Sequence, residues 1–128
     1  MTLRTSRMHF LRYGTAIVLA CTLSACATRP ARTTSLVPGE QATFEGRIVG
    51  VDTDPWAYDG NAVVTVATAN SGTVQVQLPA RWNLCKAEAP GDVQALRPND
   101  RVQVAGTVTE AGTVVVCEQP QHHLRKVD

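Results

Sequence analysis

Hydrophobic and polar residues alternate along much of the chain from residue 42 onward. In the stretch 73–78, Val74, Val76 and Leu78 fall on one face and polar residues fall on the other. The stretch 101–108 repeats this pattern with valines. A period of two residues with many β-branched side chains is typical of a half-buried antiparallel strand. We therefore predict strands over 44–52, 62–68, 73–78, 101–108 and 113–118.

Short turn sequences separate these predicted strands. Asn-Ser-Gly at 70–72 joins the second strand to the third, and Glu-Ala-Gly at 110–112 joins the fourth to the fifth. Both sequences favour tight hairpin turns. Gly46 and Gly50 interrupt the first predicted strand, where they indicate bulges or bends. A bent first strand suits a small barrel, because that strand is shared by the two sides of the barrel.

The connection 79–100, between the third and fourth strands, contains one helical signal. Asp92 is a suitable N-cap for a short helix over 93–96. Five strands, with hairpins at 2–3 and 4–5 and a short helix between 3 and 4, resemble the OB-fold, a small and partly open β-barrel. The resemblance implies one all-β domain over residues 42–120. An SH3-like barrel or a small sandwich would give a similar order of elements.

The first 25 residues differ in composition from the rest of the chain. Arg4, Arg7 and Arg12 are followed by the uncharged stretch 13–25, and no acidic residue occurs there. A secretory signal has a basic start and an apolar segment of about 7–15 residues. A membrane-spanning helix needs about 20 apolar residues, which is more than this stretch offers. We therefore predict a signal peptide over residues 1–25.

The signal ends in Leu23, Ser24, Ala25 and Cys26, which resemble the lipobox of bacterial lipoproteins. The resemblance implies cleavage before Cys26 and acylation of that residue, which would attach the protein to a lipid bilayer. Ala27, rather than Asp, follows the cysteine, and by the same resemblance this favours the periplasmic face of the outer membrane over the inner membrane. Residues 18–21, which end in Cys21, are a second and weaker match to the lipobox. The remaining alternative is an ordinary cysteine beyond an ordinary cleavage site.

Residues 26–41 contain prolines and threonines but no apolar period, which predicts a flexible tether after the lipidated cysteine. Residues 121–128 follow the last predicted strand and are mostly polar. We predict that these eight residues form a solvated C-terminal tail.

Cys85 and Cys117 are the two cysteines left in the predicted domain. An even pair in an oxidising compartment indicates a disulfide bond. A redox pair is the alternative, although such pairs usually have the spacing Cys-x-x-Cys. His122 and His123 could join both cysteines in a zinc site. A disulfide would consume the thiols, so we expect a solvated tail there, with no metal site and no cofactor.

The formal net charge of +1 hides an uneven distribution. Residues 40–120 hold five basic and ten acidic residues, so the predicted barrel is acidic. Nucleic-acid binding requires a locally basic surface, and we therefore expect no nucleic-acid partner. Ser35 and Ser71 are the only serines beyond the signal, and no glycine-rich phosphate loop occurs. These observations disfavour an enzyme.

Aromatic residues gather in the connection between the first and second strands. Trp56, Tyr58 and Asp59 lie there, in a loop that flanks the binding face of OB-folds. Tyrosine and tryptophan are enriched in interaction hot spots, so these three residues are the candidate partner-binding site. Alternatively, Trp56 or Tyr58 folds back and fills the end of a valine-rich barrel. Trp82, near Cys85, is expected in the core.

The pattern as a whole predicts a non-catalytic, membrane-anchored module of the cell envelope that binds a protein partner. The alternative is a lipoprotein that binds a small ligand, such as a glycan, a peptidoglycan fragment or a metal ion.

Overall fold

The computed structural model describes residues 35–128. The predicted signal peptide, Cys26 and most of the predicted tether therefore lie outside the described residues. The strands are β1 (Gln41–Asp52), β2 (Ala62–Thr68), β3 (Gly72–Leu78), β4 (Arg101–Glu110), β5 (Thr113–Val115) and β6 (His123–Lys126). Three short 3₁₀ helices lie between them, namely η1 (Asp54–Tyr58), η2 (Trp82–Leu84) and η3 (Val93–Ala95). All five predicted strands are present. The first begins three residues earlier than predicted and the fifth ends three residues earlier.

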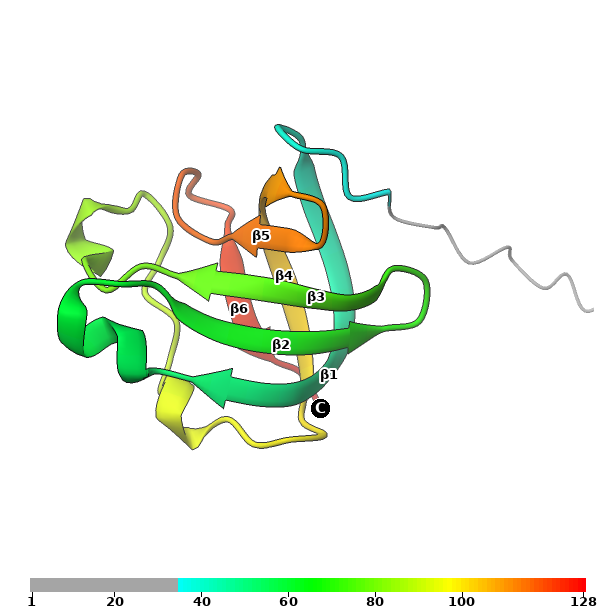
Figure 1. The fold of residues 1–128 in the computed structure, drawn as a ribbon, viewed down its shortest axis with the longest axis horizontal. Coiled ribbons are helices and arrows are strands. Elements are labelled where there is room, and N and C mark those ends of the chain that lie inside the picture. Colours follow the sequence, from blue (N-terminus) through cyan, green and yellow to red (C-terminus); the bar gives the residue numbers. More distant parts are fainter. Residues whose placement is uncertain (1–34) are drawn as a thin grey trace, which may run out of the picture.

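Strands β1 to β5 close into a barrel in the order β1-β2-β3-β5-β4, and β4 pairs with β1 to complete it (Figure 1). The pair β3–β5 is parallel and the other pairs are antiparallel. This arrangement confirms the predicted all-β, OB-like barrel.

Strand β1 serves both sides of the barrel because it bends. Its residues 41–47 pair with β4, and its residues 47–52 pair with β2. The register with β2 shifts between Ile48 and Gly50, which confirms a predicted bulge. At Gly46 an added Cβ would collide with the carbonyl oxygen of Ala67, so only glycine allows β1 to approach β2 this closely.

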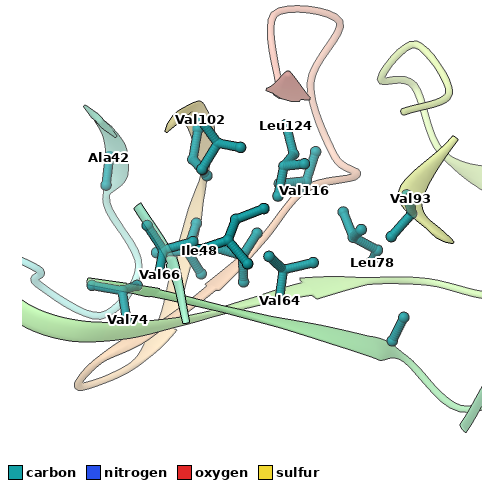
Figure 2. Close-up of a cluster of buried hydrophobic side chains, with 14 of the residues drawn as sticks. Ala42, Ile48, Val64, Val66, Val74, Leu78, Val93, Val102, Val116 and Leu124 are labelled. Atoms are coloured by element: carbon teal, nitrogen blue, oxygen red, sulfur yellow. The ribbon is translucent and has the colours of Figure 1, made fainter. Parts of the chain in front are cut away.

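Alternate residues of the strands point into one apolar core. Valines dominate it, and Figure 2 shows Val64, Val66, Val74 and Val102 around its centre. Burying a valine side chain contributes about 1.5–3 kcal/mol. The fully buried members are Leu78, Val64, Val66, Val74, Val76, Val102, Val104, Val108, Val114 and Val116.

The connection after β3 closes one end of the barrel. Val93 of η3 is 4% exposed and lies beside Leu78 (Figure 2). Asp92 caps η3, because its Oδ1 accepts from the backbone N–H groups of Gln94 (3.1 Å) and Ala95 (3.2 Å). The predicted N-cap is therefore confirmed, and the predicted short helix is a 3₁₀ turn.

The prediction of a solvated tail over 121–128 is wrong. Residues 123–126 form β6, which pairs with residues 102–105 of β4. Strand β5 ends at Val115, before the predicted end of the fifth strand, and pairs with residues 107–110 on the same edge of β4. Strands β5 and β6 thus cover successive parts of one long edge. Leu124 supplies the driving force, because it is 4% exposed and belongs to the core.

The end of the predicted tether also belongs to the barrel. Leu36 packs against the core, and the N–H of Gly39 donates to the carbonyl oxygen of Val108 at 2.7 Å. The N–H of Val108 in turn donates to the carbonyl oxygen of Glu40 at 2.9 Å. The domain therefore begins several residues before the predicted boundary at residue 42.

Candidate partner-binding surface

The connection between β1 and β2 is a structured turn. Pro55 stands in the first turn of η1, where its fixed φ suits a helix start. The N–H of Asp54 donates to Oδ1 of Asp52 at 3.0 Å, and the N–H of Gly60 donates to the carbonyl oxygen of Pro55 at 2.9 Å. Asp59 adopts a left-handed φ of 60°. These constraints fix the direction in which the side chains of the loop point.

Trp56 is half-buried and anchors this loop to the barrel. Its ring packs against the core, and its Nε1–H donates to the carbonyl oxygen of Leu78 at 2.8 Å. Leu78 is the last residue of β3, so this bond ties η1 to the end of a neighbouring strand. Trp56 is therefore the aromatic residue of this loop that folds back onto the barrel.

Tyr58 has the opposite placement, with 88% of its surface exposed. The next residue, Asp59, forms an ion pair with Arg81 at 2.7 Å. This hydrogen bond from the Arg81 guanidinium raises the pKa of Arg81 above its usual value. Both side chains are exposed, so the pair adds little stability. Its effect is to hold the loop 56–59 against the segment that follows β3.

A hollow of about 290 Å³ lies between the two indoles. Its lining residues are Trp56, Pro79, Ala80, Trp82, Ala89, Pro90, Gly91, Asp92, Val93 and Gln94. A neighbouring hollow of about 610 Å³ is lined by Thr53, Asp54, Trp56, Ala57, Tyr58 and Gln94. Both hollows include Trp56 and Gln94, so they adjoin each other at these two residues.

Trp82 packs against the core, as expected from the sequence. Its Nε1 is buried and has no hydrogen-bond partner among residues 35–128. A buried donor without an acceptor costs about 1–3 kcal/mol, so such donors are rare in folded proteins. Leu84, in the same short helix, is 71% exposed.

Cys85 and Cys117 form the predicted disulfide bond, with Cα atoms 4.6 Å apart. The carbonyl oxygen of Cys117 also accepts from the N–H groups of Lys86 (2.9 Å) and Ala87 (3.0 Å). The bond and these contacts fasten the connection 79–100 to the segment after β5. One wall of the hollow beside Trp82 is therefore held in place covalently.

His122 is buried, with 1% of its surface exposed, whereas a solvated tail was expected from the sequence. Its Nδ1 accepts from the backbone N–H groups of Cys117 and Gln119, each at 3.4 Å. Its Nε2 must then carry the proton, which it donates to Oε1 of Gln41. The adjacent histidine, His123, has a different environment. It is only partly buried, and its Nε2 contacts Oε1 of Gln103 at 3.1 Å.

A polar network continues from Gln41 into the barrel wall. Nε2 of Gln41 donates to Oγ1 of Thr107 at 2.9 Å, and that hydroxyl donates to Oε2 of Glu118 at 3.2 Å. Burial lowers the pKa of His122, and the charge of Glu118 opposes this shift. The ring is therefore held neutral, and it joins the start of β1 to the segment before β6.

The outer face of β2 and β3 lies next to these loops. Val63 pairs with Gln77 and Thr65 pairs with Gln75, so this face is uncharged and mixes polar residues with a valine. Among residues 35–128, no group of three or more His, Cys, Asp or Glu side chains gathers as metal ligands would. No helix in this described part of the chain is long and apolar enough to cross a membrane.

No protein-family model, curated protein or solved structure matches this chain. Its function is therefore inferred from its own residues.

Proposed function

We propose that this protein is a non-catalytic lipoprotein of the cell envelope, and that its barrel binds a protein partner through the surface around Trp56, Tyr58 and Asp59. Acylated Cys26 attaches it to the periplasmic face of the outer membrane. The observation that carries the binding proposal is the exposure of Tyr58 on a loop that is itself fixed at both ends.

A fixed loop lowers the cost of binding. An interface that must order a loop and its side chains loses about 0.5–1.5 kcal/mol for each immobilised side chain. Here the Trp56–Leu78 hydrogen bond and the Asp59–Arg81 ion pair already hold the backbone on both sides of Tyr58. A tyrosine exposed to this extent has no structural role in the barrel, and tyrosine is a frequent binding hot spot.

The position of the loop suits attachment through the N-terminal segment. Strand β1 begins near the first described residues, and η1 follows the other end of the same strand (Figure 1). Twelve residues of strand span up to about 40 Å along the chain. A membrane anchor that precedes residue 35 would therefore join the domain near the start of β1, and the loop 56–59 follows the other end of that strand.

The binding proposal is tested by crosslinking pull-down with Tyr58→Ala. This change removes an exposed ring and leaves the Trp56 anchor in place, so the fold is retained. Val49→Ala is the matched control, because Val49 is an exposed hydrophobic residue (55%) on β1, outside the loop. We expect Tyr58→Ala to lose a partner that the control retains. An identical set of partners for both variants would remove this loop as the site.

The anchor is tested separately by membrane fractionation. Cys26→Ser should release the protein from the membrane fraction, and Cys21→Ser should leave it attached. Retention of Cys26→Ser in the membrane would refute lipidation at that residue, and release of Cys21→Ser would move the anchor to the competing site.

A second candidate function is favoured by the hollow between Trp56 and Trp82. Its volume of about 290 Å³ approaches the lower bound of small-ligand sites, which is about 300 Å³. A glycan or a peptidoglycan fragment would then be the ligand, because the single carboxylate of this hollow, Asp92, does not suit a metal ion. A thermal-shift panel separates the two candidates, because a ligand at a hundredfold excess over its Kd stabilises the folded protein by about 2.7 kcal/mol.

A further inference from the structure

We infer that the two hollows beside Trp56 bind an extended, proline-containing and positively charged segment of the partner protein. This inference rests on the proposed function, because it names the chemistry of the partner that the surface around Tyr58 would bind.

The walls of the first hollow favour proline rings. Two indoles and two prolines, Trp56, Trp82, Pro79 and Pro90, surround it, and short residues such as Gly91 leave it open. Grooves lined by aromatic side chains are a recurrent site for polyproline II segments. Such segments are extended before they bind, so they lose little conformational entropy on binding.

The second hollow matches the repeat of the same conformation. Both hollows contact Trp56 and Gln94, so they adjoin each other at these two side chains. A polyproline II helix has three residues per turn and rises about 3.1 Å per residue, so prolines at positions i and i+3 lie on one face. Two such prolines would occupy the two adjoining hollows.

The negative charge of this surface favours a positively charged ligand. Each hollow includes one carboxylate, Asp92 in the first and Asp54 in the second, and no lysine or arginine lines either one. The carboxylate of Asp54 forms no ion pair among residues 35–128. Residues 35–128 as a whole hold eleven acidic and seven basic residues, which adds long-range attraction for a cationic segment.

Intrinsic fluorescence can test this directly, because the two tryptophans of the chain both line the first hollow. The probe is the synthetic peptide acetyl-Ala-Arg-Pro-Ala-Arg-Pro-Ala-amide, titrated into the full-length chain without its signal peptide. Control peptides replace both prolines by alanine or both arginines by glutamate. We expect a saturable change in emission with the probe and at least a roughly tenfold weaker Kd with either control.

Variants of the protein locate the binding surface. Asp54→Asn and Asp92→Asn each remove one carboxylate charge, and asparagine retains the N-cap at residue 92. Each should weaken binding about two- to fivefold, as expected for a partly exposed charge pair. Tyr58→Ala should weaken it about tenfold or more. Glu110→Gln is the matched control, because it removes an exposed acidic charge from the β4–β5 turn, and it should leave the Kd unchanged.

Three results would overturn the inference. One is no saturable binding of the probe, and another is equal binding of the glutamate or alanine peptide. The third is equally tight binding of a peptide with the sequence of residues 27–34, which has a single proline and two arginines. That result would make the segment 27–34 of this chain, in the same molecule or in a second copy, the occupant in place of a partner protein. If the probe fails while Tyr58→Ala still loses its partner in cells, the proposed function stands and only this inference fails.

Discussion

Removing the Cys85–Cys117 disulfide should lower the free energy of unfolding by about 3–4 kcal/mol. The two cysteines are 32 positions apart, and the chain-entropy relation for a closed loop of this length gives that value at 25 °C. The described domain of 94 residues is expected to have a total stability of about 5–14 kcal/mol. The crosslink therefore supplies a large fraction of the stability of this small barrel.

The double variant Cys85→Ala/Cys117→Ala in a Cys26→Ser background isolates this contribution. The hydrogen bonds from Lys86 and Ala87 to the carbonyl oxygen of residue 117 do not depend on the sulfur atoms, so the native fold should persist at 25 °C. Thermal melting should shift down by about 15–30 °C, since each kcal/mol corresponds to about 4–8 °C in a domain of this size. The m-value in urea should rise, because the uncrosslinked chain exposes more surface when it unfolds.

Reduction of the protein with native cysteines provides an independent comparison. Adding a strong reductant should move its melting temperature to that of the double variant and should leave the double variant unchanged. A shift of less than about 1 kcal/mol in the double variant would refute the loop-entropy reasoning. Two reactive thiols in the unreduced native protein would refute the crosslink itself.

Three further predictions concern residues inside the barrel. Burial lowers the pKa of His122 below its usual value of about 6.5. The free energy of unfolding should therefore be constant above about pH 6.5 and should fall below it, by at most about 1.4 kcal/mol per pH unit. Urea unfolding at several pH values measures this, and His122→Gln should abolish the dependence in that range. Gly106→Ala should lower the free energy of unfolding by about 1–3 kcal/mol, because the added Cβ would lie 2.6 Å from a valine methyl group of β5. Gly50→Ala is the control, since nothing lies within 4 Å of a Cβ added there. Leu124→Ala should lower the free energy of unfolding by about 2–5 kcal/mol in the same assay, because Leu124 is 4% exposed and lies in the core. Arg125 is exposed, so Arg125→Ala should change this free energy little.

Each of these has a result that contradicts it. A pH dependence that persists in His122→Gln would assign the titration to another group. Equal stabilities of the two glycine variants would show that β4 and β5 do not approach as closely as described. A Leu124→Ala variant as stable as the native chain would return residues 121–128 to the solvated tail expected from the sequence.

The alternation of valines with polar residues was sufficient to predict the barrel. The valines and leucine of 73–78 and the valines of 101–108 face the core as their period requires, and Gly50 lies at the bulge of β1. Strand β6 was missed because its sequence, His-Leu-Arg-Lys, has a single apolar residue and its partner lies about 20 residues away. The one available signal was that β4 is long and β5 short, which leaves part of one edge for another strand.

The candidate site was predicted only in part. The sequence indicated the aromatic loop but could not distinguish Trp56 from Tyr58, because their exposure depends on a tertiary hydrogen bond from Trp56 to Leu78. The hollow beside Trp82 was not predictable either, since its walls come from the loop after β1 and from the connection after β3. The buried role of His122 likewise depends on Gln41, 81 positions away.

The central claim is that the end of the barrel carrying Tyr58 binds a protein in the cell envelope. The most direct measurement places a photo-crosslinking amino acid at residue 58 in living cells and, as a control, at exposed residue 109 near the opposite end of β1. We expect a discrete crosslinked protein from residue 58 that is absent from residue 109. No crosslinked product at residue 58, or the same products from both positions, would contradict it.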